Sequence, residues 1–333
     1  MGFRERVWGK ARELKVHIVL PEATDVRTQV AASVALKEGI AGRLTFVGNP
    51  DEIWRVSKRE GIDISGVEIV NHIKEPSFEE FAKTYFELRK HKGITLEDAL
   101  ERMKSPLYYG AMMVRTGLVD GLVAGAVNST AELLRAAFSI IGVKPGIKTA
   151  SSCFIMILPN KNFGYDGQML FADCAIVPFP TCLQLADIAI ASADTGRKLL
   201  GFEPRVAMLS YSTKGSAQHE SIDRIVKATN MVKERRPDLI IDGELQVDAA
   251  IVKDVAAKKC PDSPVGGRAN VLIFPDLPSG NIAYKLVQRL GRAEAIGPVL
   301  QGFMKPISDL SRGCTADDIV NVIAVTAAQA MEG

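Results

Sequence analysis

The 333-residue chain lacks several features that would define its class at once. Its cysteines form no CxxC pair, which excludes the common zinc and disulfide frameworks and indicates reduced thiols in a cytoplasmic protein; they are Cys153, Cys174, Cys182, Cys260 and Cys314. No apolar run approaches the roughly 18 residues of a membrane span, and the charged N-terminal stretch contains no signal-peptide core. Neither sign of charge dominates, since 41 Lys and Arg oppose 39 Asp and Glu. A dedicated nucleic-acid binder or membrane protein is therefore not expected.

The sequence also lacks the motifs of several large enzyme classes. There is no G-x-G-x-x-G fingerprint, so the hypothesis that the protein binds a nicotinamide dinucleotide loses its main support. The GKS or GKT ending of a nucleotide triphosphate loop and the G-x-S-x-G elbow of serine hydrolases are missing too. The four histidines form no H-x-x-x-H pair, and we expect no metal site.

An alternation of short apolar runs and helical patterns fills most of the chain. The apolar runs predict strands at 16–20, 44–47, 67–70, 122–126, 206–209, 271–274 and near 296–300. Helical patterns occupy 25–37, 50–59, 77–90, the segment from 129, 181–200, 221–234, 282–290 and 315–331. This alternation predicts an α/β fold with a mostly parallel sheet.

The pattern changes near the KPGI segment at 144–147. Two β-rich runs follow at 149–158 and 168–177, with a Gly- and Asn-containing turn between them, and they predict an antiparallel pair. The length allows about two domains. We therefore place a domain boundary near residue 145, and ligands of such sheets bind beyond the carboxyl ends of strands or between domains.

The segment DLSRGCTADD at 309–318 combines groups suited to an anion. Ser311 and Arg312 supply a hydroxyl and a guanidinium, and Gly313 supplies a free amide close to a helix N-terminus. Thr315 and Asp318 fit a capping box in front of the apolar helix that follows. Asp318 can cap this helix and still carry chemistry, or it can be a cap alone.

A second polar segment follows the predicted strand at 122–126. Asn128, Ser129 and Thr130 lead into a helix, with Arg135 on its first turns, and Ser129 with Glu132 fits another capping box. Free amides and short polar side chains at the end of a strand suit a phosphate. The alternative is a capped helix with a solvated arginine. The polar loops at 210–217 and 275–282 also follow strands, but neither identifies a ligand alone.

Several long blocks, taken in order, resemble the phosphate acetyltransferase (phosphotransacetylase) family nearly from end to end. They include PEATDVR at 21–27, DGLVAGAVNSTAELLR, FADCAIVPFPT, MLSYSTKGSA, DGELQVDAAI, PDLPSGNIAYKLVQRLG and GFMKPISDLSRGCTADDIV. The family interconverts acetyl-CoA and phosphate with CoA and acetyl phosphate. The chain resembles its short form, because the sequence starts directly at the catalytic portion.

The resemblance implies two α/β domains with a cleft between them, as in isocitrate and isopropylmalate dehydrogenases, and a cytoplasmic homodimer. The catalytic residues would be Ser311, Arg312 and Asp318. Arg135 and Arg89 would bind phosphate or CoA, and Asn128, Ser129 and Thr130 would contact the acyl phosphate. No cofactor is implied, since CoA is a substrate.

Because the block from Ser311 to Asp318 must meet Ser129 and Arg135 around one phosphate, we expect the chain end to return to the first domain. The predicted domains are 1–145 with 299–333, and 146–298. Asp318 would assist ionisation of the CoA thiol, which is only about 3% ionised at pH 7. An ordinary aspartate has a pKa about 4.5 units below that of the thiol, so burial or concerted transfer must help it.

Three alternatives remain open at this point. A phosphate butyryltransferase would use the same chemistry with a longer acyl chain, and one methylene is worth only about 1–3 kcal/mol of discrimination. A metal- and nicotinamide-dependent decarboxylating dehydrogenase could share the fold. A non-catalytic regulatory domain of acetyltransferase type is the third, although Ser311, Arg312 and Asp318 are all present.

Overall fold

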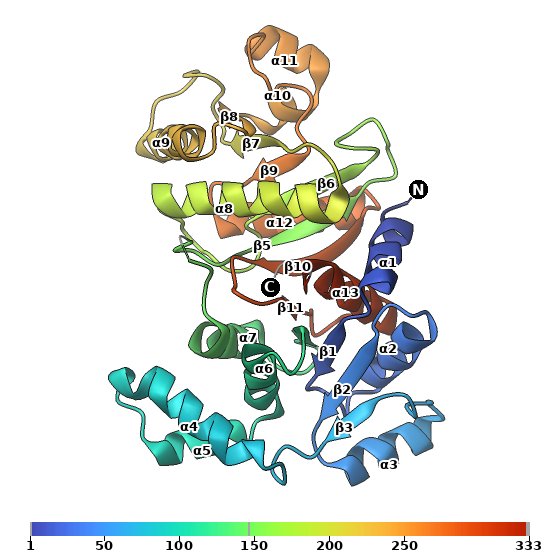
Figure 1. Cartoon of the computed structure of the whole chain (residues 1–333). Coiled ribbons are helices and arrows are strands. Elements are labelled where there is room, and N and C mark those ends of the chain that lie inside the picture. Colours follow the sequence, from blue (N-terminus) through green and yellow to red (C-terminus); the bar gives the residue numbers. More distant parts are fainter. Residues whose placement is uncertain (1, 146, 331–333) are drawn as a thin grey trace. The chain divides into compact units, whose positions relative to one another are not determined.

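The structure, a computed structural model, describes residues 2–145 and 147–330 (Figure 1). Contacts within the chain group it into two compact units. Unit 1 comprises residues 1–144 and 303–333, and unit 2 comprises residues 145–302. The boundaries predicted from the sequence fall after residues 145 and 298. No helix of the described part is long and apolar enough to span a membrane.

The sheet of unit 1 consists of parallel strands in the order β3-β2-β1-β4-β11. Their bounds are β1 His17–Leu20, β2 Arg43–Val47, β3 Glu68–Val70, β4 Gly121–Ala124 and β11 Ile307–Asp309. The strands nearest the centre are buried along almost their whole length, which explains why they read as continuous apolar runs. All their carboxyl ends meet at one edge, where ligands of parallel sheets bind.

Helices cover both faces of this sheet. They are α1 Phe3–Leu14, α2 Val26–Lys37, α3 Pro50–Glu60, α4 Ser77–Arg89, α5 Leu96–Met103, α6 Pro106–Thr116, α7 Thr130–Ala136 and α13 Ala316–Gln329. Gly121 of β4 faces Thr326 of α13, whereas its neighbour Leu122 contacts Gly110 of α6. Because adjacent strand residues point to opposite faces, α13 and α6 lie on different sides of the sheet. Helix α1 packs against α13 (Figure 1).

Unit 2 contains a mixed sheet in the order β10-β5-β6-β9-β7-β8. Its strands are β5 Ser151–Ile157, β6 Gln168–Ala172, β7 Arg205–Leu209, β8 Ile240–Leu245, β9 Val271–Ile273 and β10 Glu294–Gln301. Strand β5 is antiparallel to β6 and β10, and the remaining neighbours are parallel. The antiparallel pair predicted after residue 145 is confirmed.

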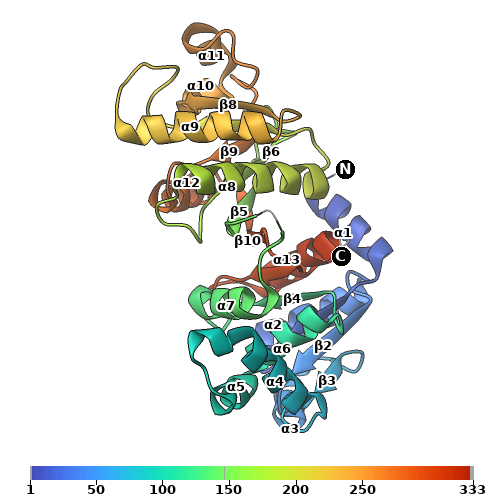
Figure 2. The same ribbon diagram turned by 60° about the vertical axis from the view of Figure 1, so that its left-hand side comes forward.

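The helices of unit 2 are α8 Cys182–Thr195, α9 Glu220–Arg235, α10 Val247–Ile251, α11 Lys253–Lys259 and α12 Leu277–Leu290. Helices α8 and α9 lie side by side (Figure 2), and Arg235 of α9 pairs with the buried Asp187 of α8 at 2.8 Å. Beyond Thr195 the chain continues as a π-helix to Leu200. The α/β class predicted from the sequence is confirmed.

Three local predictions differ from the structure. Strand β6 ends at Ala172 instead of continuing to 177, because the amides of 175–177 donate to the Asp173 carboxylate instead of to a neighbouring strand. Ser77 does not cap α4; its hydroxyl bonds to the Tyr109 hydroxyl at 2.6 Å. Helix α12 begins at Leu277, five residues before the predicted start, with Asp276 as its cap. The predicted end of the last helix at Met331 lies outside the described residues.

Candidate active site

The loop after β4 is built around the carboxylate of Glu22. The amides of Gly125, Ala126 and Val127 donate to Glu22 at 2.8–3.1 Å. Asn128 adds two more donors, its amide at 2.7 Å and its side-chain Nδ2 at 2.8 Å. The amides that we expected to be free for a phosphate are therefore already occupied, and that expectation is wrong. Glu22, buried after β1, takes the place of a bound anion.

Helix α7 begins directly after this loop. The Ser129 hydroxyl accepts from the Glu132 amide, and the Glu132 carboxylate accepts from the Ser129 amide and hydroxyl. The predicted capping box is thus confirmed. The hydroxyl of Thr130, the first helical residue, donates to Asp309 Oδ2 at 2.6 Å. This bond links the start of α7 to the end of β11.

Asp309 ends β11, opposite Ala124 of β4. Its side chain is buried, with the residue 1% exposed, and Oδ1 accepts no hydrogen bond of good geometry from the residues the structure describes. Burial raises the pKa of Asp309 to about 6, although the Thr130 hydroxyl and the nearby Leu310 amide act in the opposite direction.

Ser311 and Arg312 follow in an exposed turn between β11 and α13. Ser311 Oγ accepts from the Gly313 amide at 3.3 Å, and the Ser311 carbonyl accepts from the Cys314 amide at 2.9 Å. The free amide expected at Gly313 is thus engaged, while both side chains that we predict to be catalytic remain accessible.

Arg27 of α2 holds this turn against the loop after β4. Its Nη1 donates to the carbonyls of Arg312 at 2.7 Å and Cys314 at 3.0 Å, and its Nη2 donates to the Ala126 carbonyl at 2.9 Å. Asp25, which caps α2, pairs with the same guanidinium at 2.8 Å and keeps it in place. Arg27 therefore braces both polar segments found in the sequence.

Asp318 lies in the first turn of α13. Its Oδ2 accepts from the amide and the hydroxyl of Thr315, each at 2.8 Å, and Thr315 Oγ1 accepts from the Asp318 amide. The predicted capping box is confirmed here as well. Asp318 is exposed, so its carboxylate can reach a substrate while it caps the helix.

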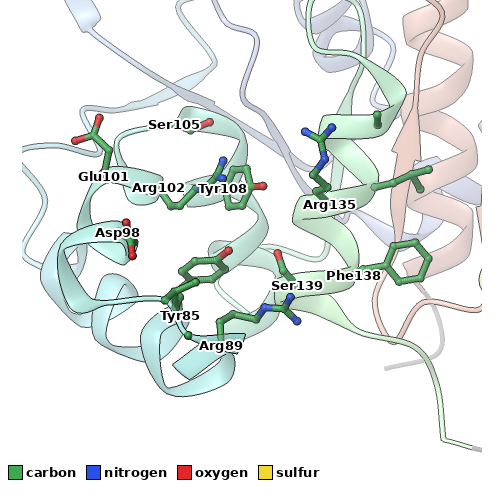
Figure 3. A pocket seen from close by; sticks show the side chains of 14 residues that line it. Tyr85, Arg89, Asp98, Glu101, Arg102, Ser105, Tyr108, Arg135, Phe138 and Ser139 are labelled. Atoms are coloured by element: carbon green, nitrogen blue, oxygen red, sulfur yellow. The ribbon is translucent and has the colours of Figure 1, made fainter. Parts of the chain in front are cut away.

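Arg89 and Arg135 line one pocket of unit 1, with a volume of about 1020 Å³. Arg89 ends α4 and Arg135 lies on α7, and Figure 3 shows both among the side chains that line the pocket. Arg102 lines the same pocket and stacks over Tyr108, with its guanidinium carbon 5.3 Å from the ring centre. Asp98 and Glu101 line the pocket as well, so its three guanidinium groups outnumber the carboxylates by one and could bind a phosphorylated ligand.

The predicted site residues fall into two groups within unit 1. The first is the network that joins Asn128, Ser129 and Thr130 to the 309–318 segment, and the second is the pocket that contains Arg89 and Arg135. Helix α7 belongs to both. The pocket lining does not include Ser311, Arg312 or Asp318.

Three residues that organise this region, Glu22, Arg27 and Asp309, belong to no motif from which a role could be predicted. Glu22 and Arg27 lie in the PEATDVR block and Asp309 directly precedes the SRG segment. The signal that could have revealed them is a single charged residue at or just after the end of an apolar strand. Among the residues that the structure describes, no cluster of His, Cys, Asp or Glu could hold a metal ion.

Accessible hydroxyl, guanidinium and carboxylate groups thus follow the carboxyl end of the parallel sheet in unit 1. The same unit contains a pocket whose lining includes three arginines. This arrangement is that of an α/β enzyme for anionic substrates. Residues 2–327 match the family described as phosphate acetyl/butaryl transferase. The chain belongs to this family of acyltransferases.

Individual relatives agree with this assignment. The chain is 56% identical to the phosphate acetyltransferase of Thermoanaerobacterium thermosaccharolyticum over 99% of this chain and all of that one. It is 50% identical to that of Clostridium acetobutylicum over the full length of both. Among solved structures, a phosphotransacetylase from Streptococcus pyogenes matches with a TM-score of 0.93, 42% identity and complete coverage of both chains.

A more distant solved structure is similar in fold alone. A 4-hydroxythreonine-4-phosphate dehydrogenase described as putative, from Salmonella typhimurium, has a TM-score of 0.54 at 10% identity, with 94% of this chain and 99% of that one covered. The dehydrogenase-like architecture predicted from the sequence is thereby confirmed.

Proposed function

We propose that the chain catalyses the reversible transfer of an acetyl group between CoA and inorganic phosphate. The observation that carries the proposal is the accessible turn of Ser311 and Arg312, held by Arg27 next to the exposed carboxylate of Asp318. Full-length similarity to phosphate acetyltransferases supports the acetyl group as the one transferred.

The anionic groups of the substrates would be bound by arginines. Arg312 would hold the phosphoryl group of acetyl phosphate, while Arg135 and Arg89 would bind phosphate groups in their pocket. Ser311 would donate a hydrogen bond to the oxyanion that develops on the acetyl carbonyl. The hydroxyl of Thr130 already donates to Asp309, so Thr130 can contact the acyl phosphate only as an acceptor or through its amide.

In the direction of acetyl-CoA formation, the CoA sulfur attacks the acetyl carbon and the bond between that carbon and the phosphate oxygen breaks. Asp318 would take the proton of the thiol, and phosphate would leave. Because Asp318 is exposed in the structure, we propose that proton transfer is concerted with attack of the sulfur. The transfer is direct and uses no metal or prosthetic group, and CoA is a substrate.

A covalent route through a cysteine has little support. Burial raises the pKa of Cys314 to about 11 and raises that of Cys153 strongly. Either thiol would be almost entirely protonated near pH 7 and hence a poor nucleophile. Direct transfer in a ternary complex is therefore the preferred mechanism.

The test is the consumption of CoA thiol with acetyl phosphate. The native protein is expected to consume thiol, and Asp318→Asn should lower kcat by at least 100-fold with little change in KM, because the cap persists while the base is lost; about 10²–10⁴-fold is typical for a general base. Asp317→Asn, which changes the neighbouring exposed carboxylate, should remain active.

Thr315→Ala separates capping from catalysis. It removes the cap of α13 but leaves the Asp318 carboxylate, and it should cost about 1 kcal/mol of unfolding free energy with most of kcat retained. Near-normal turnover in Asp318→Asn would refute the role of that residue. Faster turnover with butyryl phosphate than with acetyl phosphate would identify a butyryltransferase, and thiol consumption with neither would refute the proposed function.

We also propose a cytoplasmic homodimer. The five free cysteines support a reducing compartment. An exposed apolar stripe on α12, formed by Ile282, Leu286 and Leu290, supports association with a second copy.

A further inference from the structure

Asp309 is a buried carboxylate that the proposed chemistry does not use. Its residue exposure is 1%, and its Oδ1 accepts no hydrogen bond of good geometry within the described residues, although the Leu310 amide acts weakly on the carboxylate. Burying a carboxylate that is only partly satisfied costs stability. A carboxylate kept at such a position, next to the candidate active site, calls for a functional reason.

The chain positions of its neighbours suggest that reason. Ser311 and Arg312 follow Asp309 by two and three residues, while its Oδ2 accepts the hydroxyl hydrogen of Thr130, which starts α7. Helix α7 carries Arg135 into the arginine pocket. Asp309 is therefore the direct side-chain link between the catalytic turn and the helix of a substrate-binding arginine.

The backbone around Asp309 leaves it little freedom. Gly125 lies so close that a Cβ there would be 2.4 Å from Asp309 Oδ1 and 2.5 Å from the Leu310 amide nitrogen. The φ of Gly125 is +118°, a conformation that favours glycine. The carboxylate is thus held between the two loops and cannot turn to solvent without moving one of them.

We propose that Asp309 is a positioning residue whose carboxylate, through the Thr130 hydroxyl, holds the first turn of α7 in register with the Ser311–Arg312 turn. The inference rests on the proposed acetyl transfer. Asp309 touches no reacting atom; it acts through Thr130 on one side and through the chain on the other.

The charge of Asp309 strengthens this link. Burial places its pKa at about 6, so the carboxylate is mostly ionised at pH 8 and mostly protonated at pH 5. The charged group that bears on it is Glu22, from the segment after β1, which raises the pKa further. Helix α7 contributes the Thr130 hydroxyl. An ionised acceptor forms a stronger hydrogen bond than a neutral one, by about a factor of two in energy.

The first test is the pH profile of acetyl transfer. Asp309→Asn keeps the shape and an acceptor oxygen but removes the charge, so kcat at pH 8 should fall about tenfold, which corresponds to about 1.4 kcal/mol. KM should change less than threefold, and the ionisation near pH 6 present in the native profile should disappear. Thr130→Val should lower kcat similarly, and the double variant should be no worse than either single one.

Ser308→Ala is the matched control on the same strand. Ser308 is also fully buried, but its hydroxyl accepts from Thr326 of α13. This variant should lose stability and keep the native pH profile. A purely structural role of Asp309 would produce the same pattern in Asp309→Asn.

A second readout is independent of activity. The folded-state pKa of about 6 exceeds the ordinary value of 3.8, so the folded chain binds more protons than the unfolded chain between these values. The native protein therefore loses stability as pH rises from about 4 to 6. The Tm of Asp309→Asn relative to the native Tm should increase from pH 4.5 to pH 7.5.

The outcomes separate the two proposals. A native protein without acetyl transfer would overturn the proposed function, and the role of Asp309 with it. An active native protein together with an Asp309→Asn variant of unchanged kcat and pH profile would overturn the positioning role alone. Additive losses in the double variant would also overturn it, because they would separate Asp309 from Thr130.

Discussion

In both units, a carboxylate of the protein itself accepts hydrogen bonds from backbone amides that follow the end of a strand. Glu22 accepts four consecutive amides after β4, and Asp173 accepts the amides of Ala175, Ile176 and Val177 after β6. Such amide clusters are the usual binding sites for phosphate in other α/β folds. Because the protein itself fills these clusters, we expect phosphate to be bound by side-chain cations, as proposed for Arg312 and Arg135.

Removal of Glu22 tests its part in this arrangement. Glu22→Ala should lower the free energy of unfolding by about 3 kcal/mol, because several buried amides lose their acceptor. Acetyl transfer should fall as the loop that leads into α7 loses order. Added formate, which can occupy the vacated position, should restore part of both stability and kcat.

Glu22→Gln is the control, since it keeps one acceptor oxygen without the charge, and it should lie between the native protein and Glu22→Ala. Thermal melts and thiol assays over a formate series measure both effects. A Glu22→Ala protein with native stability, or one on which formate has no effect, would contradict the interpretation.

At the residue scale, local patterns were predictable and distant contacts were not. The capping boxes of Ser129 with Glu132 and of Thr315 with Asp318 involve residues three apart, and the structure contains both. The bonds from Glu22 to the 125–128 loop span more than 100 residues. No periodicity in the sequence reports such a contact, because it depends on which strand ends become neighbours in the sheet.

Among the elements, the central strands β1, β2 and β4 of unit 1 were predictable because they are short apolar runs that are buried along almost their whole length. Strand β11, Ile307–Asp309, was not predicted because two of its three residues, Ser308 and Asp309, are polar, so it does not read as an apolar run. Helix α6 was also missed, since it is buried over most of its surface and lacks a polar face. Strand β8 contains Asp242 and Glu244, whose carboxylates pair with Lys214, Ser263 and Ser212, so its sequence does not read as apolar.

The close approach of β4 and β11 at their carboxyl ends depends on Gly125. Gly125→Ala should destabilise the protein by about 3 kcal/mol and abolish most acetyl transfer, because its Cβ would collide with Asp309 and Leu310 in a backbone conformation unfavourable for alanine. Denaturant unfolding and the thiol assay measure the two effects.

Gly61→Ala provides the comparison. Gly61 also has a positive φ, +67°, as the C-cap of α3, but a Cβ there would meet no atom within 4 Å. Its cost should stay near 1 kcal/mol with activity retained. Equal effects of the two substitutions would show that steric contact at Gly125 is unimportant.

At the scale of the whole molecule, the proposed association would involve α12. Ile282, Leu286 and Leu290 are four residues apart and share one helix face, with exposures of 58%, 51% and 80%. A helix face that is exposed only to water usually carries polar side chains, whereas this one carries three large apolar ones. It is the surface on which we expect a second copy to pack.

If the proposed dimer forms, Leu286→Asp should convert it to a monomer at micromolar concentration, because the substitution places a charge in an apolar contact. Sedimentation velocity gives the mass directly. Lys285→Asp changes the charge of an exposed neighbour on the same helix and should leave the dimer intact. A native protein that sediments as a monomer would refute this surface.

The hydrogen bonds of the Arg27 guanidinium to two loops have a consequence for local unfolding around the candidate site. One guanidinium bonds to carbonyls of two loops, at Ala126 on one side and at Arg312 and Cys314 on the other. If either loop departs, its bonds to Arg27 break and the two loops lose the link that the guanidinium provides between them. We therefore expect the segments after β1, β4 and β11 to unfold locally as one cooperative unit, so their amides should exchange with solvent deuterium at a common rate instead of at three separate ones.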